Sequence, residues 1–331
     1  MGRRWLKGIL LVLTVAFLLL AGFFFWASSS TLDEADYAYT TDYATPSAPP
    51  SDTLTVITYN IGYLSGMTNN RPLERTEAFM EDNLNVAAES LCNTQADVIA
   101  FQEIDFAARR SHDVQQLNAL AKRCGFAASA SVVNWDERYV PFPSANPLMH
   151  FGRTVSGQAV LSRYPILRQE RIALARPATP FYYDAFYLDR LAQVVAIDVG
   201  RPLALINVHL EAWDETTRER QAEAVRGLYQ KLVANQPTLL LGDFNSELTT
   251  ARQKHREDQA ISLLLEGTNL RAALPDPSAA TLTYPADVPT VKIDHIFYDP
   301  AQMSVLEARV LETATPPSDH RALLVRLAFK K

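Results

Sequence analysis

Two oxygen-bearing side chains follow a short apolar run in the stretch TLLLGDFNSE, residues 238–247. Side chains alternate along a strand, so Asp243 and Asn245 are expected on one side and Phe244 on the other. A buried strand has no structural need for a carboxylate and a carboxamide at its end. The pair therefore predicts a site at which two polar groups act on the same reactant.

Similar polar side chains stand beside the other apolar runs of the sequence. They are Asn60, Glu103, His209, Asp294, His295, Asp319 and His320. Functional residues often collect at the edges of sheets, where rigid strands hold them. Each residue taken singly has an ordinary explanation, such as a turn, a cap or a buried histidine. Their repetition in one chain predicts that they form a common site.

The types of these residues indicate a particular chemistry. Carboxylate and carboxamide oxygens suit a hard divalent cation, which we expect to be Mg²⁺, with Mn²⁺ as the alternative. Histidines and further carboxylates can transfer protons and stabilise charge. A metal that polarises a phosphoryl oxygen, together with a base that orients water, hydrolyses phosphoesters. The sequence has no G-x-G-x-x-G or P-loop motif, so a glycine loop that cradles a nucleotide is excluded.

The elements that must position these residues alternate between strands and helices, with hairpins between them. Helices are expected over 76–94, 113–124, 216–234 and 253–266, and strands over 53–60, 97–103, 157–166, 191–200, 203–211, 238–243, 292–299 and 321–329. Residues 134–156 are expected to form an irregular aromatic loop. The hairpins predict a mixed-sheet α/β domain rather than a purely parallel one.

The N-terminus has a membrane-targeting pattern. Residues 1–8 are basic, and residues 9–27 carry no charge and are apolar on every face. Such a segment is long enough to span a bilayer as a helix. Phe25-Trp26-Ala27 is a poor signal-peptidase site, so an uncleaved anchor is favoured over secretion after cleavage. The basic flank should stay cytoplasmic, which places the rest of the chain outside.

The remaining chain is predicted to contain a linker and one globular domain. Residues 28–52 are rich in Ser, Thr, Ala and Pro and predict a flexible linker, with the domain over 53–331. Cys92 and Cys124 lie late in two predicted helices, and on the outer side of a membrane they either pair or remain buried thiols. The net charge of −6 provides no overall basic field for nucleic acid, although a local basic groove remains compatible with it. Nothing indicates a protein partner.

Seven short motifs together resemble a known family. YNIG, FQEID, GQAVLSRYPI, NVHLE, GDFNSE, KIDHIF and SDHRALL occur in the order seen in the endonuclease/exonuclease/phosphatase superfamily, which includes deoxyribonuclease I, apurinic endonucleases, neutral sphingomyelinases and inositol polyphosphate phosphatases. The resemblance covers about 53–329. It implies a four-layer sandwich of two packed mixed sheets flanked by helices, and a metal-dependent phosphoester hydrolase. The motifs are much less specific for substrate.

The resemblance also implies roles for individual residues. Glu103 resembles the main Mg²⁺ ligand, with Asn60 beside it and Asp319 completing the metal environment. The catalytic set is implied to be His209, Asp243, Asn245, Asp294 and His320. In this set the aspartate and asparagine of GDFN position the water and the phosphate. His320 would act as the base or stabilise the phosphate, and Asp294 would orient the ring of His320. His209 would contact the phosphate or protonate the leaving oxygen. Which histidine is the base, and whether one or two metals bind, stays open.

The substrate also stays open among three hypotheses. The leading one is a lipid or small-molecule phosphoester outside the cytoplasm. The anchor, the acidic balance and two aromatic stretches, residues 134–143 and 181–190, support it, and Tyr139 and Tyr187 are candidate substrate contacts. The second is DNA or RNA, for which a basic groove would use Arg109, Arg110, Arg153 and Arg163. The first two of these arginines are also candidate phosphate contacts for either substrate. The third is a binding module without catalysis, which the complete set of polar residues disfavours.

Overall fold

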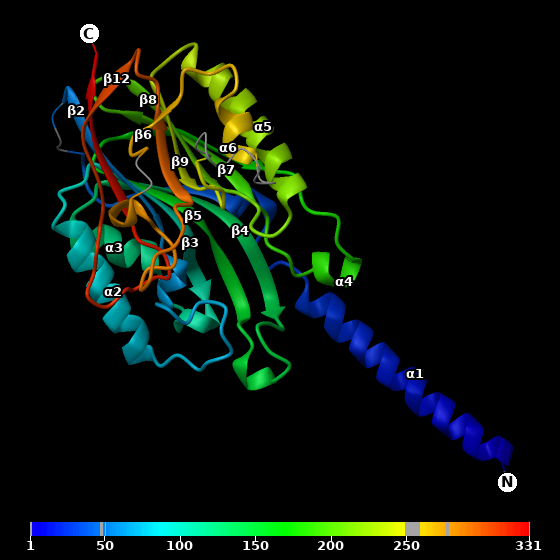
Figure 1. Ribbon diagram of the computed structural model, residues 1–331. Helices are drawn as coiled ribbons and strands as arrows, with labels where there is room; N and C mark the ends of the chain where they lie inside the picture. Colours follow the sequence, from blue (N-terminus) through cyan, green and yellow to red (C-terminus); the bar gives the residue numbers. More distant parts are fainter. Residues whose placement is uncertain (1, 47–48, 50, 249–258, 276–277, 331) are drawn as a thin grey trace.

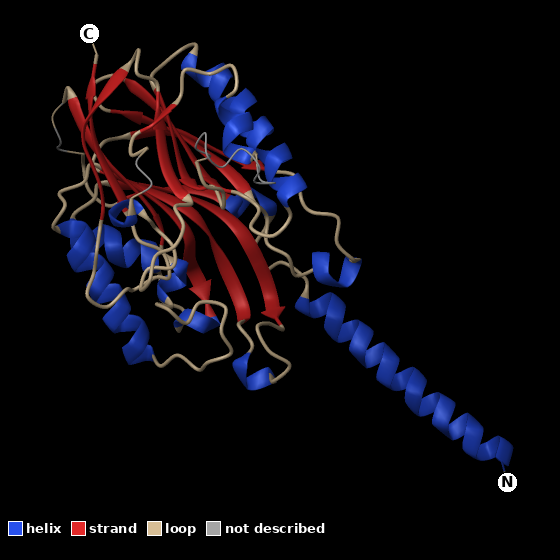
Figure 2. Ribbon diagram, viewed as in Figure 1, coloured by secondary structure: helices blue, strands red, loops and turns tan. Residues whose placement is uncertain are grey.

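The computed structural model describes residues 2–46, 49, 51–248, 259–275 and 278–330. Two mixed β-sheets pack face to face, and helices lie on the outer face of each (Figure 2). The fold is therefore the predicted four-layer sandwich of the α/β class.

The larger sheet has seven strands in the order β1-β4-β5-β3-β2-β13-β12. Their bounds are β1 Ala38–Asp42, β2 Thr53–Asn60, β3 Val98–Ala108, β4 Ala128–Val140, β5 Gly152–Ser162, β12 Met303–Val310 and β13 Leu323–Phe329. Strands β2 and β3 are parallel, and β5 is antiparallel to both β3 and β4. Because of this pairing, β2, β3 and β4 run in the same direction and their carboxyl ends share one edge of the sheet.

The smaller sheet has six strands in the order β10-β11-β9-β8-β7-β6. Their bounds are β6 Ile166–Ala173, β7 Leu191–Asp198, β8 Pro202–His209, β9 Thr238–Asp243, β10 Arg271–Ala272 and β11 Asp294–Tyr298. Strands β8 and β9 are parallel with His209 opposite Asp243, and β11 is antiparallel to β9 with Asp294 opposite Asp243. The register alone thus places three predicted site residues side by side.

The strand sequences explain the layers. Ile57 and Ile99 belong to the core beneath the helices of the larger sheet, whereas Val56 and Val98 belong to the core between the two sheets. This alternation buries both faces of each strand. Helices α2 (Glu77–Cys92) and α3 (Gln116–Cys124) cover the larger sheet, and α5 (Glu215–Val233) and α6 (Ala260–Leu265) cover the smaller one (Figure 1).

The helix boundaries follow local chemistry. Thr76 and Asp214 cap the first turns of α2 and α5, where their side chains accept backbone N–H groups. Helix α3 ends at Gly125, whose φ of 67° is a conformation that glycine adopts easily. The remaining helices are α4 (Phe181–Asp184) and short 3₁₀ segments at Glu34–Tyr37, Gly62–Leu64, Arg109–Ser111, Pro147–Met149 and Ala279–Thr281.

Helix α1 (Gly2–Ala27) projects away from the body of the molecule (Figure 1). Its segment Arg3–Ala27 has a mean hydropathy of 2.7, and within the described residues it is the helix whose length and composition suit a membrane span. Nearly all of its side chains are exposed.

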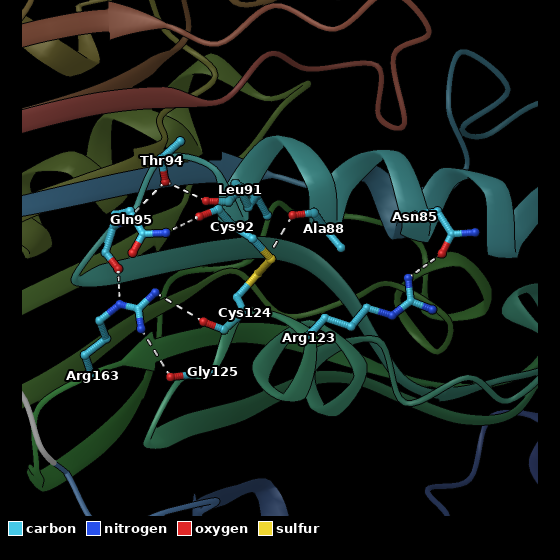
Figure 3. The surroundings of a disulfide bond; sticks show 11 residues. Asn85, Ala88, Leu91, Cys92, Thr94, Gln95, Arg123, Cys124, Gly125 and Arg163 are labelled. Carbon is cyan, nitrogen blue, oxygen red and sulfur yellow. Dashed lines mark hydrogen bonds between the residues drawn. A yellow bond between two sulfur atoms is a disulfide. The ribbon is translucent and has the colours of Figure 1, made fainter.

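Cys92 and Cys124 form a disulfide that joins the ends of α2 and α3 (Figure 3). Arg163 donates hydrogen bonds to the backbone carbonyls of Cys124 and Gly125 beside it. The question that the sequence left open is thus decided in favour of a bonded pair.

Within the described part of residues 28–52, the prediction of a flexible linker does not hold for the segment 38–42. Residues Ala38–Asp42 form β1, which pairs with β4 in antiparallel register from Ala38 opposite Val132 to Asp42 opposite Ala128. The Ser- and Thr-rich composition misled the prediction, because small polar residues are also tolerated at a sheet edge, where one side of the strand faces solvent.

Three further predictions need correction. The irregular loop predicted over 134–156 is limited to residues 141–151, because β4 extends to Val140 and β5 begins at Gly152. Strand β3 continues beyond Glu103 to Ala108. Strands β1, β4, β6, β10 and β12 were not predicted. Part of the predicted helix 253–266 falls outside the described residues, and α6 begins at Ala260.

Candidate active site

The predicted polar residues converge at one edge of the sandwich, where strands of both sheets end. Asn60 ends β2, His209 ends β8 and Asp243 ends β9, while Asp294 begins β11. Beneath them, Gln102 of β3 donates a hydrogen bond of 2.6 Å to the side-chain oxygen of Asn207 in β8. This buried contact between the two sheets fixes the two halves of the site relative to each other, because unpaired buried amides would be costly.

Asp243 lies at the centre of the cluster. Its Oδ2 accepts a hydrogen bond of 2.9 Å from Nδ2 of Asn60 and lies 3.5 Å from Nε2 of His209 and 3.8 Å from Nε2 of His320. Burial, followed by the charge of Asp294, raises the pKa of Asp243 to about 7. The carboxyl group can therefore exchange a proton near neutral pH.

Asn245 reaches this carboxylate by a different route from the one predicted. Strand β9 ends at Asp243, and Asn245 has a φ of 48°, so strand alternation does not apply to it. Its backbone N–H donates to Oδ1 of Asp243 at 2.9 Å, and its side-chain amide donates to the carbonyl of Leu210 at 2.9 Å. The side chain of Asn245 is thus held by a turn beside the cluster.

His320 forms a buried pair with Asp294. Nδ1 of His320 lies 2.9 Å from Oδ2 of Asp294, and the ring's other nitrogen faces Asp243 and Asn60. Burial alone lowers the pKa of His320, but the carboxylates of Asp294 and Asp243 outweigh it and raise the pKa to about 10. His320 is therefore protonated at neutral pH and places a positive charge beside Asp243.

His209 has the opposite electrostatic environment. Burial, and then the positive charges of Arg190 and His320, hold its pKa well below the usual value. Its Nε2 lies 3.8 Å from Oε1 of Glu103 and 3.5 Å from Oδ2 of Asp243. The two histidines thus differ in charge at neutral pH, which the sequence did not show. His295 lies outside this cluster, because its ring is buried against Phe244 and Phe297.

Glu103 occupies a β-bulge rather than the end of its strand. The pairing of β3 with β5 shifts between Phe101 and Ile104, and Glu103 has a φ of 51°. Bulges re-aim side chains beside active sites. Here the bulge leaves the Glu103 carboxylate partly exposed, beside His209 on one side and Asn69 on the other.

Glu103 and Asp319 share a hydrogen-bond donor that sequence reasoning missed. Nδ2 of Asn69 lies 2.9 Å from Oε2 of Glu103 and 3.4 Å from Oδ1 of Asp319. Asn69 lies in the loop after β2, and no strand end or motif drew attention to it. Burial raises the pKa of Asp319 to about 6, and the nearby charge of Glu103 adds to the effect.

The donor set fits a hard divalent metal. Two carboxylates, from Glu103 and Asp319, approach one amide donor, and Asn60 adds a carboxamide from the neighbouring strand. Oxygen ligands of this kind suit Mg²⁺ or Mn²⁺, and a cation would relieve the repulsion between the carboxylates. Ligand atoms of Asp243, Asp294 and His320 also lie within 4.8 Å of one another. However, Nδ1 of His320 and Oδ2 of Asp294 already pair with each other, so the Glu103 group is the better candidate for a metal site.

The four predicted substrate-binding residues separate in the structure. Tyr187 donates hydrogen bonds of 2.7 Å to both carboxylate oxygens of Glu211, close to the site. Arg110 is buried, donates to Asp105 at 2.8 Å and 3.1 Å, and stacks on Tyr63. Arg109 is exposed and lies over Gly152. Tyr139 contacts Phe23 of α1 rather than the site.

Arg190 is a further site residue that the sequence analysis missed. Its side chain is buried, and its Nε lies 3.6 Å from Oε2 of Glu211. Within the described part of the chain, its Nε and Nη1 have no hydrogen-bond partner. Burial lowers the pKa of Arg190, but the charges of Tyr187 and Glu211, and then those of Glu103 and Asp243, raise it above the usual value. A buried guanidinium with free donors beside carboxylates suits an anionic ligand. Arg190 directly precedes β7, and this position beside a strand end was the sequence feature that could have identified it as a site residue.

The comparisons with known proteins agree with this geometry. The sequence model of the Endonuclease/Exonuclease/phosphatase family matches residues 57–320. No curated protein sequence matches the chain.

Solved structures share the fold. An endonuclease/exonuclease/phosphatase from Beutenbergia cavernae is 18% identical over 84% of this chain and 72% of its own, with a TM-score of 0.63. A mannosyl-6-phosphatase from Bacteroides thetaiotaomicron is 21% identical over 83% of this chain and 100% of its own, with a TM-score of 0.57. The human Nocturnin catalytic domain is 18% identical over 91% of this chain and 100% of its own, with a TM-score of 0.56.

At these identities the structural neighbours establish the fold, whereas the sequence match covers most of the chain and contains the clustered carboxylates and histidines. The chain belongs to the endonuclease/exonuclease/phosphatase family and is a metal-dependent hydrolase of ester bonds.

Proposed function

We propose that this protein is a membrane-anchored, Mg²⁺-dependent hydrolase of a lipid or small-molecule phosphoester, with its catalytic domain on the extracytoplasmic side. The observation that carries the catalytic part is the position of Asp243, which lies between a neutral and a charged histidine and accepts a hydrogen bond from Asn60.

Glu103, Asp319 and Asn60 would hold the metal. When bound, a divalent cation polarises the phosphoryl oxygen and neutralises developing charge. Asn69 orients the two carboxylates through its shared hydrogen bonds. The bulge at Glu103 directs its carboxylate out of the strand.

Asp243 accepts the proton of the attacking water, and Asn245 is held beside it by the turn. A pKa of about 7 suits a group that must gain and lose a proton at neutral pH. His320 is charged and its ring is fixed by Asp294, so it stabilises negative charge on the phosphoryl group instead of acting as the base. His209 contacts the phosphate or leaving oxygen from the other side of Asp243.

Arg190 contributes positive charge to phosphate binding, and its Nη1, which has no hydrogen-bond partner among the described residues, supplies the donor. Glu211 holds the guanidinium from behind at 3.6 Å, and Tyr187 in turn donates to Glu211 at 2.7 Å. Tyr187 thus acts by positioning Glu211 and Arg190.

The length and hydropathy of α1 support the membrane anchor. Ala27 at its end is fully buried against the domain, which favours an uncleaved helix over a removed signal peptide. The disulfide between Cys92 and Cys124 supports an extracytoplasmic location, because disulfides persist in oxidising compartments.

The partners of the arginine side chains argue against nucleic acid as the substrate. Of the four candidates for a basic groove, Arg110 pairs with Asp105, Arg153 with Asp113, and Arg163 with backbone carbonyls at the end of α3. Arg110 and Arg163 thus hold the fold together, and Arg153 is engaged in an exposed ion pair.

The function can be tested with the full chain purified in detergent. Product release would be measured with Mg²⁺, with Mn²⁺ and with EDTA on sphingomyelin, phosphatidylinositol, soluble inositol phosphates, DNA and RNA. We expect metal-dependent turnover of a lipid or small phosphoester. Turnover of nucleic acid alone would replace this substrate class with the nuclease hypothesis.

Two variants connect the activity to the site. Asp243→Asn should reduce the rate by on the order of 10²-fold or more, because it removes the proton acceptor. Glu103→Gln should lower the rate and raise the Mg²⁺ concentration needed for half-maximal activity. Asp97→Asn is the control, because Asp97 accepts a hydrogen bond from Thr55 at the start of the neighbouring strand, away from the site. If both site variants keep the full rate, the assignment is wrong.

A further inference from the structure

The segment that follows α1 is clamped to the domain by one strand. Asp136 of β4 accepts hydrogen bonds from the backbone N–H groups of Thr31 and Leu32 at 2.9 Å and 2.8 Å, and from the hydroxyl of Tyr37 at 3.1 Å. Two residues further along β4, Arg138 bonds Ser29 through its backbone N–H at 3.0 Å and its Nε at 2.9 Å. The chain is therefore fixed to the domain from the second residue after the helix.

The last turn of α1 also packs on the domain. The ring of Phe23 lies 5.7 Å from that of Tyr139, and the ring of Phe24 lies 5.5 Å from Phe186 and 6.0 Å from Phe181. Aromatic pairs at these distances attract each other beyond their buried area. The orientation of α1 relative to the domain is thus set by side-chain packing as well as by hydrogen bonds.

The anchor and the active site lie at the same edge of the larger sheet. Strand β4 runs in the same direction as β2 and β3, so its carboxyl end, where the clamp lies, shares an edge with Asn60 and Glu103. The same part of β4 also supports the site: Trp135 donates to the carbonyl of Phe186 at 3.1 Å, one residue before Tyr187. Figure 1 shows α1 leaving the body beside α4.

Exposed apolar side chains lie on the two segments next to the packed end of α1, which are α4 and the loop that follows β4. We name as the apolar collar the residues Phe142, Leu148, Phe181, Tyr182 and Tyr183, which belong to α4 and the β4–β5 loop. Phe181 is 75% exposed and Leu148 is 78% exposed. A cluster of exposed apolar groups marks an interaction site, and tyrosine suits the layer of lipid headgroups. Phe24 of the anchor helix packs on Phe181, and Phe23 packs on Tyr139 just before the β4–β5 loop, so the bilayer that α1 would enter is the partner that suits these residues.

We propose that the apolar collar lies in the headgroup layer of the membrane that α1 spans, so that the active-site edge faces the bilayer and takes its phosphoester from a lipid. This inference rests on the proposed function for the anchor and for phosphoester hydrolysis. A flexible linker would let the domain move freely relative to the membrane. Here the contacts of Asp136 and Arg138 hold the domain in one orientation relative to α1.

Docking can be measured without any enzyme activity. Full chains carrying Tyr182→Cys or Leu306→Cys would be labelled with a polarity-sensitive fluorophore and placed in liposomes. The native cysteines are bonded to each other and do not react. Leu306 is the matched control, since it is 52% exposed, close to the 60% of Tyr182, and lies in β12 at the opposite end of the sheet from β1.

We expect the label at position 182 to emit at shorter wavelength and to be quenched by lipids with a nitroxide in the headgroup region, and the label at position 306 to do neither. Equal, water-like emission at both positions would overturn the proposal. Asp136→Ala should weaken quenching at position 182. If that variant does not fold, Arg138→Ala, which removes only the Ser29 side-chain contact, is used instead. Unchanged quenching in the folded variant would show that the clamp does not orient the domain.

The lipid substrate needs a second measurement. Phe181→Ser combined with Tyr182→Ser should reduce turnover of a phospholipid in liposomes at least about tenfold, because it removes apolar area from the interface. Turnover of a soluble ester with the same headgroup should not change, and Leu306→Ser should affect neither. Equal loss on both substrates would overturn the interfacial role.

The two proposals can fail separately. If the wild-type protein hydrolyses no phosphoester, the proposed function fails, and the fluorescence result still decides docking. If it hydrolyses the soluble ester and position 182 remains in water, only the docking proposal fails.

Discussion

Nδ1 of His320 lies 2.9 Å from Oδ2 of Asp294, and both side chains are buried. This contact fixes the imidazole so that its other nitrogen faces Asp243. It is also a main reason that the pKa of His320 rises to about 10 in spite of burial.

Asp294→Asn should therefore lower both the pKa of His320 and the catalytic rate. The loss of the oriented charge should reduce kcat by about 10- to 100-fold. The titration of His320, followed by NMR, should move to lower pH. Asp299→Asn is the control, because Asp299 is a buried carboxylate that directly follows the other end of β11 and accepts a hydrogen bond from the backbone N–H of Ala301. A full rate in Asp294→Asn would contradict the positioning role.

Arg190 and Arg110 should respond differently to substitution. Arg190→Ala should reduce kcat/KM by on the order of 10²-fold or more while the protein stays folded, because it removes the positive charge that we assign to phosphate binding. Arg190→Lys should restore only part of this, since ammonium lacks the planar fork of guanidinium.

Arg110→Ala should mainly lower stability, by about 3–5 kcal/mol, because it leaves Asp105 buried without its partner. Urea unfolding and steady-state kinetics on the same samples separate the two effects. A loss of rate in Arg110→Ala at unchanged stability would return this residue to the substrate-binding set.

The disulfide should contribute a large share of the stability of the α2–α3 layer. Cys92 and Cys124 are separated by 32 residues. Closing a loop of that length reduces the entropy of the unfolded chain, which corresponds to about 3–4 kcal/mol. Replacing both with serine should lower the free energy of unfolding by this amount in urea. Dithiothreitol should destabilise the wild type and leave the variant unaffected, and equal stability with and without reductant would exclude the bond.

His295 should make the protein less stable in acid. Burial, and then the charge of Lys292, lowers its pKa to about 4 from 6.5. The unfolded chain therefore binds a proton between these values and the folded protein does not. The stabilisation is fully present above pH 6.5 and is lost as the pH falls, by about 2 kcal/mol between pH 7 and pH 5.

His295→Gln removes this titration and can still donate to the carbonyl of Ser246, which lies 3.1 Å from Nε2 of His295. Its free energy of unfolding should therefore change less between pH 7 and pH 5 than that of the wild type. Chemical denaturation at the two pH values tests this, and parallel losses in both proteins would refute the assignment.

The sequence by itself determined the elements whose patterns are local. The alternating residues of β2, the continuous apolar run of β9 and the apolar face of α5 predicted those elements closely, because each pattern reflects burial against neighbouring layers. The polar residues at strand ends identified Asn60, Asp243 and Asp294 as neighbours, because strand ends meet at sheet edges. The apolar run at the N-terminus likewise predicted α1.

The tertiary structure alone decided what depends on contacts between distant residues. Asn69 and Arg190 joined the site because loops bring them there, and Arg110 left the substrate-binding set because Asp105 holds it. Residues 28–52 looked like a linker, yet hydrogen bonds to Asp136 and pairing with β4 order much of this segment. The composition of a segment indicates only how readily it is solvated. The residue that orders this segment, Asp136, lies about a hundred residues further along the chain, so the segment's own sequence does not reveal it.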